Sequence, residues 1–341
     1  MRPTKIGGFV LLQEETFDAE TKIISILKVL SESAGSLGST AISRSLEVRG
    51  IDLSERTVRY HLKTTDERGF TVPLGRDGRM ITAEGLEELR FALAPVQVSF
   101  MRHRLELLAF LTTFDPAKHS GAVPINTSLF SEDTFADAKA IMSGAFAAGL
   151  CVSDLVATAR EGEKLGDVVI PKGQVGLATI CSVVLNGVLL KMGIPMESKF
   201  GGVLEIGQRK PKRFVAIIDY GGTSLDPSEQ YIRAGMTSVS EASSTGNGRI
   251  LANFREMPGP AVPMVEEVIP MLKNAGVGGV FALGNPSEQV CQISVSLNRS
   301  GLVLLGGLNP MAAVVESGIE VQNIGESGIV DYQRLVSFRT L

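Results

Sequence analysis

The sequence has 341 residues, 44% hydrophobic and 21% charged, with a formal net charge of −4 at neutral pH, which is ordinary for a globular protein of two or three domains. This acidic balance excludes a chain that coats nucleic acid over its whole surface, so any DNA contact must be a local basic patch. Three cysteines without a CxxC pair support neither a disulfide framework nor a zinc site, and no apolar run approaches a membrane span, so we expect a protein of the reducing cytoplasm without contact to a membrane.

The N-terminal region begins with a predicted loose arm over residues 1–17, followed by helical patterns. Residues 19–33 place apolar side chains at helical spacing, and residues 39–48 do so over a shorter stretch with Ile42 and Leu46 facing inward. Both segments predict helices of a small domain.

A third helix is predicted over residues 54–68. Ser54 can accept hydrogen bonds from the free amides of the first turn, and Val58 and Leu62 share one apolar face. The opposite face carries polar and basic side chains at spacings of three and four residues, which is typical of a DNA-recognition helix. The candidate DNA contacts on this helix are Arg56, Thr57, Arg59, Tyr60 and Lys63.

Residues 71–82 predict a hairpin with Asp-Gly chemistry at its tip. Three helices followed by a basic-tipped hairpin describe a winged helix, which we assign to residues 18–94, with a fourth helix at its end. In this geometry the third helix enters the major groove, while Arg76 and Arg79 on the wing reach the backbone or the minor groove.

The basic patch of this domain is modest. Between Arg44 and Arg79 eight positive residues oppose six negative ones, a net charge of +2. Because phosphate contacts dominate non-specific affinity, we expect tight binding only from a dimer on paired half-sites. In the alternative interpretation the winged helix serves protein contacts and the arginines form a solvated face.

A connector is predicted over residues 95–120. Its helix, residues 99–114, carries an apolar stripe of Met101, Leu105, Leu108 and Leu111. This stripe either packs on the regulatory part of the chain or pairs with itself across a dimer axis, and the sequence leaves both interpretations open.

The remaining residues, 121–341, contain an internal duplication. Two glycines and an asparagine in the first half of the first copy recur 127 residues later in the second copy. Two glycines in the second half of the first copy recur 125 residues later. The pairs are Gly121 and Gly248, Asn126 and Asn253, Gly149 and Gly276, Gly176 and Gly301, and Gly193 and Gly318.

The pattern in each half predicts a β-α-β-β-α-β unit, so the fold class is α+β with a winged helix followed by a duplicated ferredoxin-like regulatory domain. The copies cover residues 121–197 and 248–324, and residues 198–247 form an insertion with its own strand and helix. A competing register matches residues 201–235 with a segment near the C-terminus, but only the longer register covers both copies from end to end.

The sequence lacks the residues that enzymatic catalysis commonly requires. The histidines are His61, His103 and His119, so the repeats contain no histidine that could act as a general base or metal ligand, and neither a Walker loop nor a G-x-S-x-G elbow is present. An enzyme that uses Arg255 and Asp226 on an α-keto acid is the remaining catalytic alternative, but we expect a protein without catalytic residues, metal or cofactor.

Four turns of the repeats place small and polar residues before predicted helices. Glycines allow a ligand to approach the backbone, and free helix-start amides bind anions, so these turns predict a carboxylate or phosphate site in which Arg255 clamps a carboxylate. Alternatively, most of the turns only reverse the chain and cap helices, and Cys181 packs as a small hydrophobe. The candidate effector-binding residues are Cys181, Ser182, Asn186, Thr223, Ser224, Asp226, Arg255 and Asn309.

Five segments of the second part resemble the NrpR regulatory domain of an archaeal nitrogen-repressor family that also occurs in some bacteria; they are residues 170–195, 200–207, 220–232, 250–261 and 306–320. The N-terminal part resembles the winged helix also found at the start of ribonuclease R. The resemblance implies a repressor of nitrogen-assimilation genes that binds operator DNA as a homodimer or higher oligomer and is released by 2-oxoglutarate. The best-known family members carry two regulatory domains in tandem, whereas this sequence has one. The alternative is an adaptor that holds DNA through a partner regulator.

Overall fold

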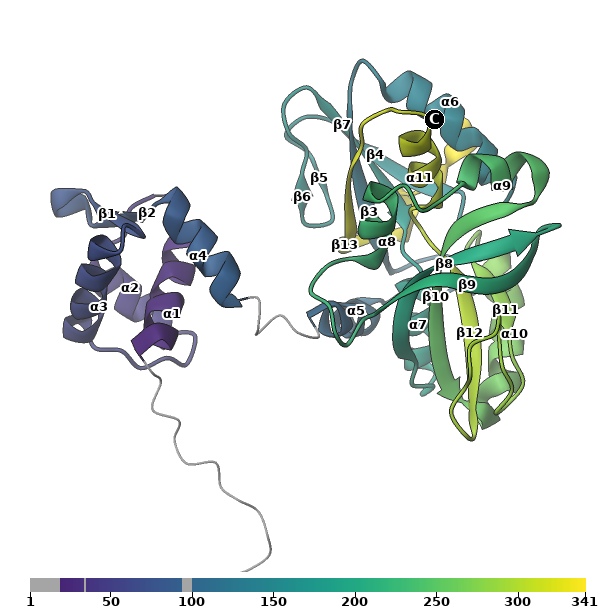
Figure 1. The fold of residues 1–341 in the computed structure, drawn as a ribbon, viewed down its shortest axis with the longest axis horizontal. Coiled ribbons are helices and arrows are strands. Elements are labelled where there is room, and N and C mark those ends of the chain that lie inside the picture. The colour runs from purple at the N-terminus through teal and green to yellow at the C-terminus, as the bar shows by residue number, and fades with distance from the viewer. Residues whose placement is uncertain (1–18, 34, 94–99) are drawn as a thin grey trace, which may run out of the picture. The chain divides into compact units, whose positions relative to one another are not determined.

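The computed structural model describes residues 19–33, 35–93 and 100–341, and the chain divides into two compact units between Val96 and Gln97 (Figure 1). The predicted arm over residues 1–17 lies outside the described residues, as does the segment that joins the two units. Each unit is therefore considered separately.

The first unit has the predicted winged-helix architecture, with helices before and after a two-stranded antiparallel wing. Every predicted helix of this unit is present, and the hairpin tip is a short 3-10 turn, Gly75–Asp77. The elements are α1 (Ala19–Ser31), α2 (Ser39–Glu47), α3 (Glu55–Glu67), β1 (Thr71–Pro73), β2 (Arg79–Ile81) and α4 (Ala83–Leu93).

Local signals define α3 at both ends and along its buried face. The Ser54 hydroxyl accepts a hydrogen bond from the Thr57 amide at 3.2 Å, which confirms the predicted cap. Val58 and Leu62 are fully buried in the core that α3 shares with α1 and α2. His61 is buried as well, a position for which the sequence analysis assigned no role, and burial lowers the pKa of its imidazole.

The wing is anchored to the helical core beside α2. Leu37 and Arg79 exchange main-chain hydrogen bonds of 2.9 and 3.0 Å. Gly78 has φ +94°, and a Cβ atom at this position would lie 2.3 Å from the Leu37 carbonyl oxygen. Only glycine fits here, because a side chain would collide with the backbone of the segment that holds the wing.

The second unit contains two five-stranded antiparallel sheets and seven helices among its described residues (Figure 1). The strand orders are β13-β3-β7-β4-β14 and β11-β12-β10-β8-β9. The strands are β3 (Ala122–Ser131), β4 (Leu155–Ala159), β7 (Gln174–Ile180), β8 (Glu197–Gly207), β9 (Lys210–Asp219), β10 (Gly248–Pro258), β11 (Val280–Leu283), β12 (Arg299–Leu305), β13 (Gln322–Asp331) and β14 (Val336–Ser337), with a small hairpin of β5 (Lys164–Leu165) and β6 (Val168–Val169). The helices are α5 (Phe100–Leu111), α6 (Phe135–Ala147), α7 (Val183–Lys191), α8 (Pro227–Arg233), α9 (Val239–Thr245), α10 (Val262–Asn274) and α11 (Asn309–Glu316).

The two copies of the duplication are intertwined. Each supplies a β-α-β-β-α-β unit, but β8 of the first copy pairs with β10 of the second, and β13 of the second pairs with β3 of the first. The orders β13-β3-β7-β4 and β8-β10-β12-β11 both have the ferredoxin-like arrangement only because the last strands are exchanged. The last strand of the first copy, β8, runs to Gly207, so the inserted β9, α8 and α9 begin after it, later than predicted.

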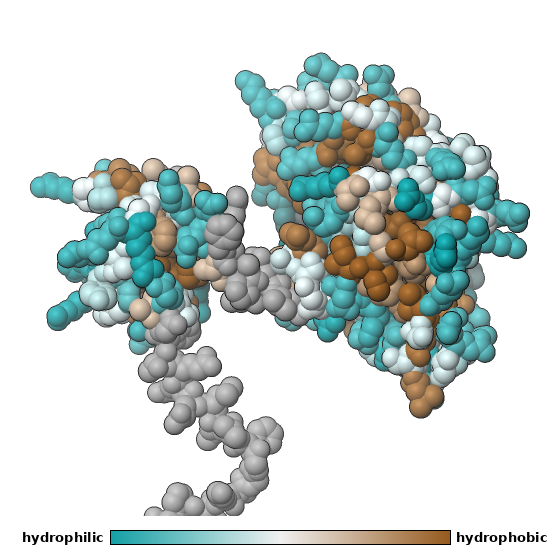
Figure 2. All heavy atoms as spheres, in the orientation of Figure 1, coloured by the Kyte–Doolittle hydropathy of each residue, from teal (hydrophilic) through white to brown (hydrophobic). Residues whose placement is uncertain are grey.

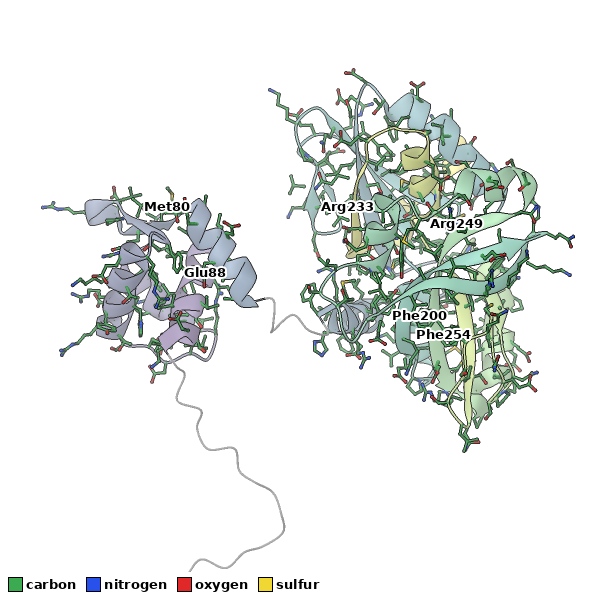
Figure 3. The ribbon with its side chains drawn as sticks, in the orientation of Figure 1. Met80, Glu88, Phe200, Arg233, Arg249 and Phe254 are labelled. Atoms are coloured by element: carbon green, nitrogen blue, oxygen red, sulfur yellow. The ribbon has the colours of Figure 1, made fainter. Side chains whose placement is uncertain are left out.

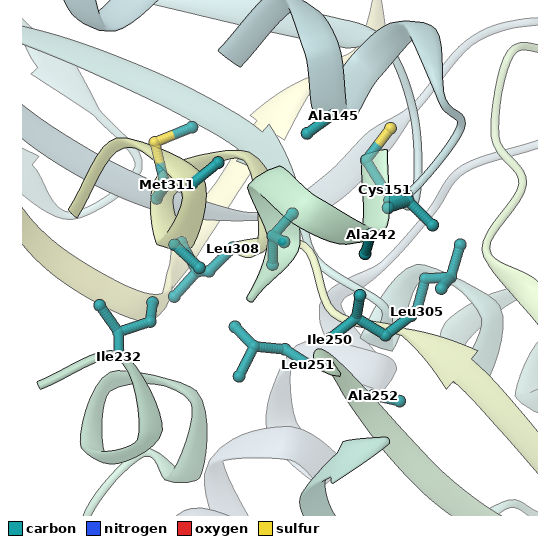
Figure 4. Packing of buried hydrophobic residues seen from close by; sticks show 14 of the residues in the cluster. Ala145, Cys151, Ile232, Ala242, Ile250, Leu251, Ala252, Leu305, Leu308 and Met311 are labelled. Atoms are coloured by element: carbon teal, nitrogen blue, oxygen red, sulfur yellow. The ribbon is translucent and has the colours of Figure 1, made fainter. Parts of the chain in front are cut away.

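The exchange includes the helices that precede these strands, so each hydrophobic core combines both copies. Buried side chains of α6 and α11 share one core, and those of α7 and α10 share the other. Figure 1 shows the first pair in the upper part of the unit and the second in the lower part. Figure 4 shows part of the first core and labels Met311 of α11, Ala145 of α6 and the strand residue Leu251 among its buried side chains.

Aromatic rings add to the packing on the second sheet. The rings of Phe200 and Phe254, labelled in Figure 3, stack with centroids 5.1 Å apart and planes 9° from parallel. Phe214 of β9 meets the Phe200 ring edge-on at 4.9 Å. These contacts join β8, β9 and β10 through their side chains as well as through their ladder hydrogen bonds.

Helix α5 belongs to the second unit and packs on the regulatory fold. Met101, Leu105 and Leu108 of the predicted stripe are buried against Cys181, Val183 and Tyr220. The other side of the helix exposes Leu107 and Phe110, and Figure 2 shows such hydrophobic residues gathered in patches on the viewed face of this unit. Within residues 19–33, 35–93 and 100–341, none of the helices combines the length and apolar character that a membrane crossing requires.

Candidate functional site

The solvent-facing side of α3 carries the predicted DNA contacts. The side chains of Arg59 and Lys63 are 64% and 79% exposed, and Tyr60 is 70% exposed. Arg59 pairs with Glu55 at 2.7 Å, and Lys63 lies 3.8 Å from Glu67. Exposed pairs of this kind contribute only about 0.3–0.5 kcal/mol, so both cations are available to exchange a carboxylate for a phosphate or a base.

The wing presents one of its two predicted arginines. Arg76 lies exposed at the tip. Arg79 instead donates from Nε to Asp66 Oδ2 at 2.8 Å with its side chain 27% exposed, and the same carboxylate accepts from Thr71. Arg79 therefore ties the wing to α3, and this contact competes with a role on DNA. Thr57, also predicted as a contact, is half-buried and bonds to the Ser54 hydroxyl at 2.8 Å.

In the second unit, a buried arginine forms the centre of a polar cluster. Arg255 lies within β10, opposite Ser198 of β8 and Leu302 of β12, and is 0% exposed. Its Nε donates to Asn186 Oδ1 at 3.4 Å, and its guanidinium carbon lies 5.2 Å from the centre of the Tyr220 ring. The prediction that a turn presents Arg255 is wrong, because the residue lies in the ladder of a central strand.

Glu326 lies in an irregularity of β13 within the same cluster. The register of β13 on β3 shifts between Ile324 and Gly328, and Glu326 has the unusual φ of +45° for a residue with a side chain. Its amide donates to Asn126 Oδ1 at 3.1 Å, and its carbonyl accepts from Arg104 Nε at 2.8 Å. Bulges and strained residues of this kind recur beside functional sites, where they direct a side chain inward.

Hydrogen bonds between polar side chains connect the centre of the cluster to both copies. The Tyr220 hydroxyl donates to Asn253 Oδ1 at 2.6 Å, and Asn253 Nδ2 donates to the Ser182 hydroxyl at 3.0 Å. Asn126, the duplicate of Asn253, donates to Thr179 at 3.5 Å. The cluster therefore lies where the two copies exchange their last helix and strand, beside the segments that lead from β7 to α7 and from β12 to α11.

Two atoms of the cluster lack the partners that buried polar groups require. Among the described residues, neither the Arg255 Nη2 nor the Glu326 Oε2 has a hydrogen-bond partner, although both residues are almost fully buried. Leaving a buried charged group unsatisfied costs more than about 1–3 kcal/mol. Such a cost at two groups of one cluster requires an explanation, and a ligand that bonds to both groups supplies one.

Burial also changes the protonation of the acids in the cluster. It raises the pKa of Asp226 to about 7, and the neighbouring charge of Glu229 adds to the rise. Burial raises the pKa of Glu326 well above its usual range, with Asp226 adding to the effect and Arg104 and Arg255 opposing it. Burial therefore favours the protonated form of the Glu326 carboxyl, which can donate a hydrogen bond.

Five of the eight predicted effector residues belong to this cluster. The Cys181 thiol lies 3.8 Å from the Glu326 carboxylate, and burial raises the pKa of this thiol, which keeps it unreactive near neutral pH. Asp226 caps α8 through the Ser228 amide at 2.9 Å beside Gly325 of the β13 irregularity. The five residues are Cys181, Ser182, Asn186, Asp226 and Arg255.

The other three predicted effector residues hold the chain in place. Asn309 accepts from the Leu251 amide at 2.7 Å and donates to the Leu251 carbonyl at 3.0 Å, so its amide fastens α11 to β10. The Thr223 hydroxyl bonds to the main chain of Leu225, and the neighbouring Ser224 is half-buried in the same turn. These side chains therefore stabilise a turn of the chain and the packing of α11 on β10.

Sequence reasoning missed several members of the cluster. The repeat had already singled out Asn126 and Asn253, although only as landmarks of the duplication. Arg104, Tyr220 and Glu326 had no local signal, because their roles depend on contacts between segments far apart in the chain. Glu326 corresponds in the duplication to Gly201, and Arg255 corresponds to Ser128, so these two ionisable residues differ from their counterparts in the other copy.

A small cavity reaches one side of the cluster. It has a volume of about 120 Å³ and lies between α5, α7 and the start of β8, with Asn186 and Ser198 in its wall. The Asn186 amide donates to the Ser198 hydroxyl at 3.2 Å and accepts from Arg255 on its other atom. Asn186 therefore contacts both the cavity and the Nε of Arg255. In the part of the chain that the structure describes, no group of His, Cys, Asp and Glu could hold a metal ion.

Comparison with known proteins identifies relatives of both units. The family model described as NrpR regulatory domains NRD1 and 2 matches residues 98–337, and the model of the ribonuclease R winged-helix domain matches residues 24–89. The global nitrogen regulator NrpRI of Methanosarcina mazei is 38% identical over 316 residues, which are 93% of this chain and 97% of that protein.

Two further relatives and a solved structure agree with these matches. The global nitrogen regulators NrpR of Methanococcus maripaludis and Methanocaldococcus jannaschii are 33% and 32% identical over 86% and 93% of this chain, which spans 51% and 55% of their lengths. The crystal structure of a nitrogen repressor-like protein from Methanococcus jannaschii superimposes with a TM-score of 0.58 at 29% identity, covering 71% of this chain and 98% of that one.

Proposed function

The chain belongs to the NrpR family of nitrogen regulators, and on this premise we propose that it represses nitrogen-assimilation genes by binding operator DNA and is released by 2-oxoglutarate. It is a regulator rather than an enzyme, as its relatives are named. In this proposal the winged helix binds DNA as part of a homodimer, and the polar cluster around Arg255 binds the effector.

The observation that carries the effector half is the buried pair of unpartnered atoms on Arg255 and Glu326. A guanidinium binds a carboxylate through two parallel hydrogen bonds, which supports an acid as the ligand. Burial raises the pKa of Glu326 and so favours its protonated form, which can donate to a second acceptor such as a keto oxygen. A small keto acid with a second carboxylate has acceptors for both groups.

Calorimetry on the full chain tests this half. We expect a saturable heat with 2-oxoglutarate and a weaker one with glutarate, which has the same two carboxylates but lacks the keto oxygen. The absence of saturable heat with either acid would remove effector sensing from the proposal. Equal affinity for the two acids would retain a dicarboxylate site but exclude a contact to the keto group.

For the DNA half, Arg59→Ala is expected to weaken operator binding by about 1–3 kcal/mol if Arg59 reads a guanine. The matched control is Arg49→Ala, because Arg49 is another partly exposed arginine of the same unit in a short ion pair, with Glu32, but it lies outside α3. Fluorescence anisotropy on a fragment of the protein's own promoter measures both variants. Equal affinities for wild type and Arg59→Ala would show that the recognition face lies elsewhere on the unit.

A second candidate function is an adaptor that reaches DNA through a partner regulator. It is favoured by the pairing of three basic residues on and beside α3, since Arg59, Lys63 and Arg79 each lie close to an acid of their own unit. Gel shifts with the purified protein alone separate the two functions. Retardation of promoter DNA supports the repressor, whereas retardation only after addition of a second regulator supports the adaptor.

A further inference from the structure

We propose that Arg104 is the positioning residue through which the polar cluster acts on helix α5, the first described element after the winged-helix unit. This inference rests on the proposed function of the cluster as an effector site. It adds the means by which occupancy of that site is passed toward the DNA-binding part of the chain.

The first step is the contact itself. Arg104 lies in the middle of α5, and both its Nε and its Nη2 donate to the main-chain carbonyl of Glu326, at 2.8 and 2.5 Å. This two-pronged contact joins α5 to a residue 222 positions away in sequence. A charged donor makes each hydrogen bond stronger than a neutral one would be.

The second step concerns what Arg104 holds. The β13 irregularity around Glu326 departs from the hydrogen-bond ladder of the sheet. Three of its main-chain groups bond to side chains instead. The Gly325 amide donates to Glu229 at 2.8 Å, the Glu326 amide to Asn126 at 3.1 Å, and the Glu326 carbonyl accepts from Arg104. Because Glu326 also has φ +45°, this segment is held in a strained conformation by its surroundings and can change when one contact changes.

The third step links the irregularity to the effector. The Glu326 carboxyl has one oxygen near the Cys181 thiol and one oxygen without a partner. A ligand that bonds to this free oxygen acts on the same residue whose carbonyl Arg104 grips. The side chain of Glu326 therefore lies in the proposed effector site, while its main-chain carbonyl contacts α5 through Arg104.

The fourth step is the fit of α5 against the rest of the cluster. Met101, Leu105 and Leu108 pack on Cys181 and Tyr220, so α5 covers the back of the site along its buried face. The Met101 amide also donates to the Thr223 carbonyl at 3.5 Å, in the loop that follows Tyr220. A shift of the β13 irregularity therefore acts on α5, which also packs on the effector residues. Helix α5 is thus the coupled element that allostery requires.

The test compares the full-length wild type with Arg104→Gln, with Arg104→Lys as the conservative variant and Lys191→Gln as the control. Lys191 is a suitable control because its Nζ bonds to the Phe110 carbonyl of the same helix, away from Glu326. For each protein, calorimetry gives the affinity for 2-oxoglutarate, and anisotropy gives the affinity for promoter DNA with and without 2-oxoglutarate.

We expect 2-oxoglutarate to change the DNA affinity of the wild type by a factor of about 5–150, the usual range of allosteric coupling. In Arg104→Gln this factor is expected to fall below about 3 although 2-oxoglutarate still binds saturably, and Arg104→Lys is expected to recover part of the factor. Lys191→Gln keeps the wild-type factor. An unchanged factor in Arg104→Gln overturns the inference and leaves the proposed function intact.

A measurement without ligand keeps the inference testable if the wild type does not bind 2-oxoglutarate, an outcome that overturns the proposed effector. Glu326→Gln is expected to alter amide hydrogen exchange in α5 when Arg104 is present and to have no such effect in the Arg104→Gln background. The same effect in both backgrounds, or no effect in either, overturns the role of Arg104.

Discussion

Arg255→Met is expected to weaken 2-oxoglutarate binding at least about 100-fold, because it removes the buried cation that pairs with a ligand carboxylate. Methionine fills much of the volume of the arginine stem without carrying a charge. Calorimetry on the full chain measures the change in affinity, and DNA binding by the same variant is then expected to be insensitive to 2-oxoglutarate.

Two further variants separate the chemistry of Arg255 from its structural role. Arg255→Lys keeps the charge but not the planar fork, so its affinity is expected to lie between those of wild type and Arg255→Met. Ser128→Ala changes the residue that occupies the equivalent position in the other copy, where Ser128 bonds to Asn323 at 2.7 Å, and is expected to leave ligand affinity unchanged. Undiminished binding by Arg255→Met would place the effector elsewhere.

Folding of Arg255→Met is checked independently by its thermal transition. Removing one partner from a buried charged cluster commonly costs about 3–5 kcal/mol, although the raised pKa of Glu326 favours its neutral form and reduces the charge left behind. A variant that melts cooperatively and still binds promoter DNA, but does not respond to 2-oxoglutarate, has lost the site rather than the fold.

The winged helix could be predicted from the sequence because its signals are local. The Ser54 cap and the apolar face of Val58 and Leu62 lie within one helix, and glycine and aspartate define the adjacent hairpin tip. Arg79 was harder to interpret, since its ion pair with Asp66 crosses from the wing to α3. The sequence does not distinguish a freely exposed arginine from one that an ion pair holds in place.

The duplication could also be predicted, but the exchange of strands could not. Repeated spacings show that two units have the same elements, and both a swapped and an unswapped arrangement satisfy them. The choice depends on the crossovers near Ile180 and Gly307, where a Cβ at Gly307 would lie 2.7 Å from the Ile180 carbonyl oxygen. This glycine lets the two crossovers pass in contact, and nothing in its own segment reveals that requirement.

The effector cluster was predicted in part for the same reason. Helix-start turns pointed to Ser182 and Asp226, which the structure brings into the cluster, but also to Asn309, which fastens α11 to β10 instead. Glu326 has no motif, because its importance comes from a bulged strand and from burial. Chemistry that arises from non-local packing remains invisible until the strands are paired.

The protonation of Asp226 leads to the second large expected effect. Burial and the neighbouring Glu229 raise the pKa of this carboxyl to about 7 in the folded protein, whereas its ordinary value is 3.8. The folded state therefore holds a proton that the unfolded state has released between these two pH values. Stability contributed by this group is fully present below about pH 4 and is lost as pH rises toward about 7.

Asp226→Asn is expected to remove this loss and to stabilise the protein by about 2–4 kcal/mol at pH 8, with little gain near pH 4. Asparagine caps a helix about as well as aspartate, so the bond to the Ser228 amide is retained. Denaturant unfolding between pH 4 and pH 8 measures the difference, with Asp331→Asn as the control, because Asp331 caps a short helix in the same way through the exposed Gln333 amide. An equal gain in the free energy of unfolding at every pH would contradict the linkage. The gain from Asp226→Asn increases with pH only if Asp226 ionises inside the cluster.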